Sequence, residues 1–440
     1  MVHTFPMTLP ASLVEAHRVD LASKPSDGWG FEVFDVATAE SGDSYVLSGT
    51  RRYRASDAPV EDPAEQAFTY GMITRHAPDG SPVDVALFAQ PHPDGSPSEI
   101  PELGEMTLAV LPDGQVALSG RPGSTFLLAA DLSRVTRSCR MPFGWSVEEA
   151  GPGDPYAASL SVTPSGRLLA VASEYGLSNW AGSRPNIVAV SEPGSAFAPG
   201  EKPPLEAIAS LDNRADRQTD AHLRPHLRFR GSPVGGPNRP SPSLTELVSS
   251  YRGRPHDYHD CWLGRPVPLG DELFVVPVFS RIHRSGNRGG EFTFALLDDQ
   301  GRLTGRLEGL HLYEDSPFTG FCFGLAGDPY RGRAFHLNRY GLYAWTSDGQ
   351  MRARLATEDK PFKALIHFAL MGCTSAGELL LRHRKQNLLL RLPVPQDLGD
   401  LPAALEDALR AYGPQRTALK KRYAPVEWHW AESSARVHRL

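Results

Sequence analysis

Short apolar runs alternate with turn residues along most of the chain, and the stretch 105–138 shows the pattern most clearly. Apolar runs over 106–110, 115–119, 125–129 and 134–138 are separated by turns rich in Pro, Gly, Asp and Ser. Proline presets the backbone angle that such turns need, and glycine adopts positive φ without a steric cost. The pattern predicts a four-stranded antiparallel unit. Since such a unit cannot hide both faces, it needs neighbouring sheets.

The unit recurs with two kinds of turn in strict alternation. First turns are predicted at 40–43, 111–114, 163–166, 268–271, 328–332 and 374–377. Second turns are predicted at 77–80, 130–133, 191–194, 298–301, 346–349 and 393–397. Between the two turns of each copy lies a hairpin, such as 273–280 against 292–297. Such a repeat predicts an all-β fold, a six-bladed β-propeller of four-stranded antiparallel blades, with a long insertion and a short C-terminal helical tail.

The domain boundaries follow from where the repeat is interrupted. We expect the propeller over 1–396, with an insertion at 195–258 between blades three and four that holds an edge strand near 205–209 and a short helix near 243–250. Because the last copy ends after its third strand, an N-terminal strand at 16–21 is predicted to close the ring.

The tail, 397–440, is predicted to be helical and to pack on the propeller. Asp400 can cap a helix whose apolar residues share one face, and Gly413 is expected to end it. A second, basic helix is expected over 415–423.

At this level the chain resembles six-bladed propellers of the NHL and gluconolactonase-like (TolB-like) kind. The resemblance rests on the P-[DS]-G turns at 112–114 and 164–166 and on the repeat layout. No W-D dipeptide ends a blade, so the chain does not resemble a WD40 protein. The resemblance implies a fold and transfers no catalytic residue.

Composition and charge narrow the possible partners and the location. The 440 residues are 40% hydrophobic and carry a net charge of −6, which gives no general attraction for nucleic acid. The four cysteines lie far apart and form no disulfide pattern. We found no signal peptide and no long apolar segment, so a cytoplasmic, non-membrane protein is expected. A monomer is expected as well.

The connections after the second strand of each blade form the candidate binding site. Each contains a cation, and all six should gather on one face of the ring. Positive charge concentrated there would favour an acidic protein or an anionic small molecule. The candidate residues are Arg51, Arg52, Arg121, Arg184, Arg281, His283, Arg339, Tyr340, His383 and Arg384. The alternative is that these hairpin tips are ordinary solvated loops. The first functional hypothesis is therefore a binding or scaffold protein.

An enzyme is the second hypothesis, of the propeller lyase or lactonase type, acting on an anionic substrate at the central channel. His283 could remove a proton between the arginines, and Glu174, Tyr175 and Tyr340 are further acid–base groups. No cofactor is predicted. A divalent metal is the open alternative, with His256 and His259 as candidate ligands, although H-x-x-H alone is an unspecific pattern. No nucleophile elbow, phosphate loop or dinucleotide fingerprint occurs.

Overall fold

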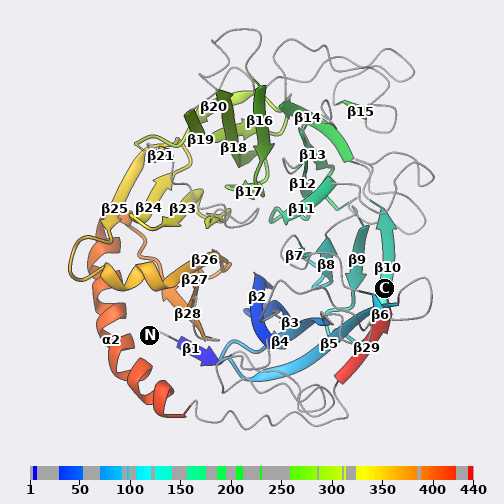
Figure 1. Cartoon of the computed structure of the whole chain (residues 1–440), viewed down its shortest axis with the longest axis vertical. Coiled ribbons are helices and arrows are strands. Elements are labelled where there is room, and N and C mark those ends of the chain that lie inside the picture. Colours follow the sequence, from blue (N-terminus) through cyan, green and yellow to red (C-terminus); the bar gives the residue numbers. More distant parts are fainter. Residues whose placement is uncertain are drawn as a thin grey trace.

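The structure is a computed structural model, and it places the strands in six sheets arranged around a central axis, as a six-bladed β-propeller (Figure 1). It describes residues 3–6, 29–52, 70–91, 97–98, 106–119, 124–140, 156–174, 186–194, 205–211, 228–229, 258–284, 287–309, 312–313, 324–383, 388–422 and 435–439. The predicted fold class is confirmed.

Blades 1 to 3 are built from strands in sequence order. Blade 1 holds β2 (Trp29–Thr38), β3 (Ser44–Arg52), β4 (Tyr70–His76) and β5 (Pro82–Pro91), with the short β6 (Pro97–Ser98) beside β5. Blade 2 holds β7 (Thr107–Val110), β8 (Val116–Ser119), β9 (Ser124–Leu128) and β10 (Val135–Arg140). Blade 3 holds β11 (Tyr156–Val162), β12 (Leu168–Glu174), β13 (Asn186–Ser191), β14 (Leu205–Leu211) and β15 (Arg228–Phe229).

Blades 4 to 6 complete the ring. Blade 4 holds β16 (Tyr258–Leu263), β17 (Val267–Pro268), β18 (Leu273–Arg284), β19 (Asn287–Asp298), β20 (Leu303–Arg306) and β21 (Leu312–Tyr313). Blade 5 holds β22 (Leu325–Asp328), β23 (Arg333–Asn338), β24 (Gly341–Thr346) and β25 (Met351–Ala356). Blade 6 holds β26 (Phe368–Cys373), β27 (Glu378–His383), β28 (Leu388–Pro393) and β1 (His3–Pro6).

Closure of the ring by the N-terminus is confirmed, but by a different segment from the predicted one. Strand β1 pairs antiparallel with β28, with His3 opposite Arg391. The predicted closing strand, 16–21, lies outside the described residues. The inner strands β2, β7, β11, β17, β22 and β26 then contact one another in this order, and β26 returns to β2. No inner strand is left without a neighbour on either side.

Each sheet has apolar side chains to bury on both of its faces, and this favours the circular arrangement of the six sheets. The described core divides into six hydrophobic clusters, and each lies between two neighbouring blades. Between blades 3 and 4, for example, Val188 of β13 packs in the same cluster as Val276 of β18. An antiparallel sheet with two apolar faces finds partners on both sides only when the sheets stand radially.

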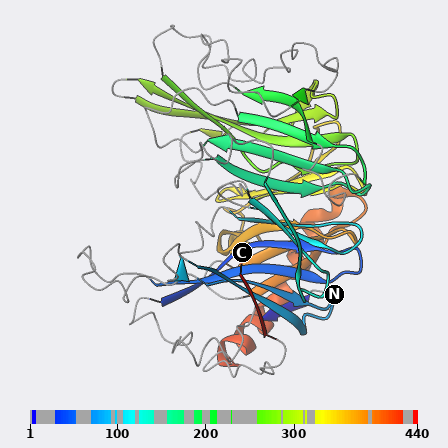
Figure 2. The ribbon, with the colours of Figure 1, turned by 90° about the vertical axis from the view of Figure 1, so that its right-hand side faces the viewer.

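The two faces of the ring differ in their connections. The predicted first and second turns gather at one end, which we call the turn face, and Figure 2 shows the strands running between it and the opposite face. Many of these turns are closed by the same hydrogen bond, as where the amide of Gly114 donates to the carbonyl of Leu111 at 2.8 Å. Gly114 has φ +84°, which only glycine adopts without strain. The connections from the second to the third strand lie at the other end, which we call the loop face.

The segments outside the repeat differ in part from expectation. The edge strand predicted near 205–209 is β14, and the helix predicted over 243–250 lies outside the described residues. In the tail, a 3₁₀ helix (Leu398–Asp400) precedes one continuous helix, α2 (Leu401–Arg422). The predicted end at Gly413 was therefore wrong. A final strand, β29 (Ala435–Arg439), pairs parallel with β5, so the tail is not wholly helical.

Helix α2 is attached to the propeller by the apolar face that the sequence indicates. Leu401, Leu405, Ala408 and Tyr412 are buried in the cluster between blades 5 and 6. The ring of Tyr412 meets Phe368 of β26 edge-on at 5.6 Å between centroids. This anchor over the first three turns carries the helix past Gly413, because the helix does not depend on intrinsic propensity alone. A 3₁₀ helix over Lys363–His367 completes the described helical segments.

Candidate functional site

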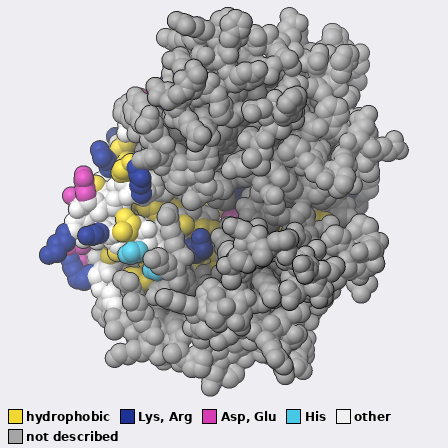
Figure 3. Space-filling view, viewed as in Figure 1, with side chains coloured by type: hydrophobic (Ala, Val, Ile, Leu, Met, Phe, Trp, Pro, Cys, Tyr) yellow, Lys and Arg dark blue, Asp and Glu magenta, His cyan; other side chains and the backbone are white. Residues whose placement is uncertain are grey.

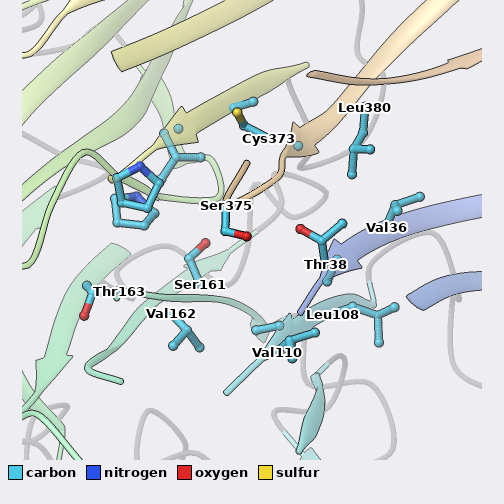
Figure 4. Close-up of a pocket in the computed structure, with 18 of the residues that line it drawn as sticks. Val36, Thr38, Leu108, Val110, Ser161, Val162, Thr163, Cys373, Ser375 and Leu380 are labelled. Atoms are coloured by element: carbon cyan, nitrogen blue, oxygen red, sulfur yellow. The ribbon is translucent and has the colours of Figure 1, made fainter. Parts of the chain in front are cut away.

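A cavity of about 190 Å³ lies at the centre of the ring and opens on the turn face. Its walls come from the last residues of the inner strands and from the first turns. Figure 4 shows labelled side chains from four of these strands around one space, among them Thr38 of β2, Val110 of β7, Ser161 of β11 and Cys373 of β26. Because each blade contributes the same part of its inner strand, the cavity is a product of ring closure.

The inner end of the cavity is formed by Arg265, which lies in a break of the inner strand of blade 4. Strands β16 and β17 both pair with β18, but residues 264–266 between them do not belong to either strand. Pro266 has no backbone N–H to give to a ladder, which favours the break at this point. The side chain of Arg265 therefore turns toward the axis, where it lines the cavity.

Arg265 joins four blades through one guanidinium. Its Nη1 donates to Oδ2 of Asp35 on β2 at 2.6 Å, and Nη2 donates to the carbonyl of Leu108 on β7. Its Nε donates to the carbonyl of Leu160 on β11 at 2.9 Å. The hydroxyl of Ser161 donates to the Pro266 carbonyl at 2.6 Å, so blades 3 and 4 are joined twice.

Asp35 lies behind this guanidinium, away from the cavity. Its carboxylate accepts from the amides of Val36 at 2.9 Å and Leu108 at 2.7 Å, besides Arg265. Burial raises the pKa of Asp35 above its ordinary value, and the charge of Arg265 together with the two amide donors opposes that shift. The side chain of Asp35 is 1% exposed and that of Arg265 is 16% exposed. The positive partner alone therefore faces the cavity.

The remaining walls alternate apolar side chains with hydroxyl groups. Val36, Leu108, Val110 and Leu380 provide apolar surface in Figure 4, where Thr38 and Ser375 point toward one another. These groups can bind a small molecule. They include no pair of acid–base side chains in hydrogen-bond contact.

Cys373 contributes a thiol to the same wall. Burial raises the pKa of this thiol well above its ordinary value, so it is protonated at neutral pH. A protonated thiol is a weak nucleophile. The side chain therefore serves as a small apolar wall residue.

On the loop face, the described candidate residues include Arg339 and Tyr340, in the turn between β23 and β24. Tyr340 is 46% exposed. The guanidinium of Arg339 lies over its ring, with Cζ 4.6 Å from the centroid, and Nη2 donates to its hydroxyl. The Oδ1 atom of Asn338 accepts from the amides of Tyr340 and Gly341, which fixes the turn. The two candidates thus form one contact pair on an ordered turn.

For the other candidates on the loop face, the structure gives a position in a strand or does not describe the residue. Arg51 and Arg52 end β3, and Arg281 and His283 lie within β18, so these four belong to strands that extend further than the sequence predicted. Glu174 ends β12. The positions of Arg121, Arg184, Arg384 and Tyr175 lie outside the described residues.

His383 ends β27 but is buried, at 4% exposure. Its ring meets Phe368 edge-on at 5.2 Å and stacks with His367 at 5.9 Å. This packing is that of a core histidine rather than of a ligand-facing group. His336 is likewise buried, in β23, and its ring meets that of Phe294 edge-on with 5.0 Å between centroids.

The candidate metal ligands are not brought together in the described part of the chain. His259 lies in β16, and His256 lies outside the described residues. Among the residues that the structure describes, no group of three or more His, Cys, Asp or Glu side chains has the arrangement of a metal site.

Arginines also occupy the turn face, so positive charge is not confined to the loop face. Arg391 of blade 6 donates to the carbonyl of Gly42 in blade 1 at 2.6 Å. Arg167 of blade 3 pairs with Asp299 of blade 4 at 3.0 Å. Further bridges between neighbouring blades come from Arg75, Arg331 and Arg333. These arginines have a structural role, since each donates a hydrogen bond or forms an ion pair with an acceptor of the next blade.

Sequence reasoning missed Asp35 and Arg265, although both leave a signal. Asp35 is a charged residue between Phe34 and Val36 in a mostly apolar strand, and Arg265 is flanked by Gly264 and Pro266 within another apolar run. A charge at a core position is expensive unless it is paired. Two such charges of opposite sign therefore suggest a pair, but nothing local says that they meet.

Comparisons with known proteins add the following findings. No family model matches the chain, and no curated protein matches it. Among solved structures, a gluconolactonase from Xanthomonas campestris is 11% identical, with 90% of this chain and 97% of that chain covered and a TM-score of 0.35. The Pan2 WD40 domain of Neurospora crassa is 8% identical, with 85% and 97% covered and a TM-score of 0.33.

A third similar structure is BamB from Moraxella catarrhalis, 8% identical, with 82% of each chain covered and a TM-score of 0.30. Similarity at this level reaches enzymes and WD40 domains alike and carries no argument about function. None of the helices in the described part of the chain is long and apolar enough to cross a membrane. The chain is a six-bladed β-propeller with fold-level resemblance to gluconolactonase-like and BamB-like propellers.

Proposed function

We propose that this propeller is a cytoplasmic binding protein whose loop face recognises the carboxylates of an acidic partner segment. The binding residues are those predicted on that face apart from the buried His383, with Arg339 and Tyr340 as the best-defined pair. Among the described residues, no contact favours the alternative of a lyase or lactonase.

The observation that carries this proposal is the geometry of the Arg339–Tyr340 turn. A tyrosine ring with a guanidinium over its face presents a flat apolar surface beside a positive charge, and Tyr and Arg are enriched among the residues that dominate binding surfaces. The turn is held from the neighbouring strand end as well, because the hydroxyl of Thr357 donates to the Arg339 carbonyl at 2.6 Å. A fixed turn loses little conformational entropy on binding.

The topology extends this surface around the ring. In every blade the second strand ends on the loop face, so Arg51 and Arg52 of β3 and Arg281 of β18 come to the same face as Arg339. Figure 3 shows Lys and Arg groups among hydrophobic, His and some acidic side chains in the described part of the visible face, over blades 5 and 6. Several cations around one mouth raise the local concentration of an anionic ligand.

Binding of a fluorescein-labelled octa-glutamate peptide, followed by anisotropy, tests the proposal. We expect a dissociation constant that rises about tenfold between low salt and a few hundred millimolar salt, because exposed charges are screened. The double variant Arg339→Gln/Tyr340→Ala should weaken binding by about fivefold or more. The matched control is Arg352→Gln on the turn face, whose side chain is 52% exposed and whose partner, Asp348, is 3.7 Å away.

Three results would argue against the proposal. The first is binding that is unaffected by salt, and the second is an equal loss in the Arg352→Gln variant. The third is competition by free citrate at the same concentration of carboxylate groups, which would show that a small anion suffices and that the face does not read a peptide.

A further inference from the structure

We propose that the cavity on the turn face is a second binding site, for a small monocarboxylate with an apolar body such as an aromatic acid. This site lies on the turn face, opposite to the loop face, and the proposal does not depend on the proposed function.

The size of the cavity sets the size of the ligand. An apolar cavity of about 150 Å³ accepts benzene. A volume of about 190 Å³ therefore accommodates one ring with a carboxylate attached. The cavity opens between the first turns, where Pro112, Pro164 and Tyr330 line the mouth, and Tyr330 is 50% exposed.

Charge within the cavity sets the sign of the ligand. Arg265 lines the inner end, and its counter-ion Asp35 is buried behind it and is not a wall residue. A ligand in the cavity therefore meets the guanidinium first. Because the side chain of Arg265 is only 16% exposed, water and salt screen its charge less than they screen the charge of a surface arginine. The hydroxyl groups of Thr38 and Ser375 are directed into the same space and can donate to a carboxylate (Figure 4).

Glu40 at the mouth limits the number of charges that the ligand carries. Its side chain is exposed, and it lines the outer part of the cavity. Water and salt weaken its repulsion of an anion more than they weaken the attraction of Arg265 at the inner end. A single carboxylate that reaches Arg265 therefore contributes favourable binding energy. A second carboxylate on the same ligand would remain near Glu40 and be repelled by it. The site should prefer a monoanion.

The apolar side chains of the cavity wall favour a ligand whose uncharged part is apolar. Val36, Val110 and Leu380 come from three different blades and face the same space. A ring placed between them is removed from water on several sides, which contributes about 25 cal/mol per Å² of apolar area.

Saturation-transfer NMR and calorimetry with benzoate, phthalate, benzyl alcohol and benzylamine test this inference on the full chain. Benzoate should bind with a dissociation constant on the order of 1 mM. Benzyl alcohol should bind about tenfold more weakly, and benzylamine and phthalate should show no saturation. Equal binding of benzoate and benzyl alcohol would overturn the assigned charge, and no binding of either would overturn the site.

A pair of matched variants locates the binding. Ser375→Met fills the cavity from the turn Thr374–Gly377. Ser347→Met makes the same change at the same position of the turn Thr346–Gly349, where the side chain is exposed and outside the cavity. Ser375→Met should weaken benzoate binding by about tenfold or more, and Ser347→Met should leave it within about twofold. The reverse order of effects would show that benzoate binds elsewhere.

Discussion

Replacing Arg265 with methionine should destabilise the fold far more than its single ion pair suggests. The change removes the donors to Asp35, to the Leu108 carbonyl and to the Leu160 carbonyl, and it leaves Asp35 with 1% exposure and no cation beside it. Removing one partner of a buried ion pair costs about 3–5 kcal/mol. Since the contacts join four blades, we expect the loss to appear in unfolding of the whole ring.

Urea unfolding followed by tryptophan fluorescence measures this loss. The matched control is Arg302→Met, which breaks a 2.6 Å pair with Asp298 on the turn face, where the arginine side chain is 75% exposed. That variant should lose no more than about 1 kcal/mol. The double variant Asp35→Leu/Arg265→Met should recover most of the loss, because no buried charge remains. A loss below about 1 kcal/mol for Arg265→Met, or no recovery in the double variant, would refute the reasoning.

The same variant should acquire a characteristic pH dependence. Without Arg265, burial acts unopposed by a cation and raises the pKa of Asp35 further in the folded state. A carboxyl with a raised folded-state pKa favours folding below its unfolded-state pKa, and this contribution is lost as pH rises through the folded-state pKa. The difference in unfolding free energy between wild type and variant should therefore be smaller near pH 4 than at pH 7.5.

Two further predictions concern blades 1 and 4. Burial lowers the pKa of His76 to about 4. The stability that is fully present above about pH 6.5 should therefore be lost as pH falls toward 4, by up to about 3 kcal/mol. The His76→Gln variant should flatten this part of the profile of urea midpoint against pH, and an unchanged profile would contradict the shift. Gly301→Ala should cost at least about 3 kcal/mol, because a Cβ there would lie 1.8 Å from the Ile208 carbonyl oxygen. Gly194→Ala, also at positive φ but with nothing within 4 Å, should cost only about 1–2 kcal/mol in thermal or urea unfolding, and equal losses would remove the steric explanation.

One turn of the candidate loop face could be predicted from the sequence, but the surroundings of the other described candidates could not. The turn at Arg339 and Tyr340 was expected, because the pattern of strands around it is local. The burial of His383 was not expected, since it depends on His367 and Phe368 from the neighbouring strand and helix. The extension of β18 through His283 depends on pairing with β16 and β19, which one strand does not reveal.

The sequence by itself determined the hairpins, their order and their turns. Strand periodicity and turn chemistry act over a few residues, so Gly114, Gly166 and Gly377 mark their turns whatever the rest of the chain does. Only the tertiary structure decided which segment closes the ring and how Asp35 meets Arg265, 230 residues away. The physical reason is that closure depends on how six sheets bury their apolar faces together, and a cavity or buried ion pair on the axis exists only after that packing is complete.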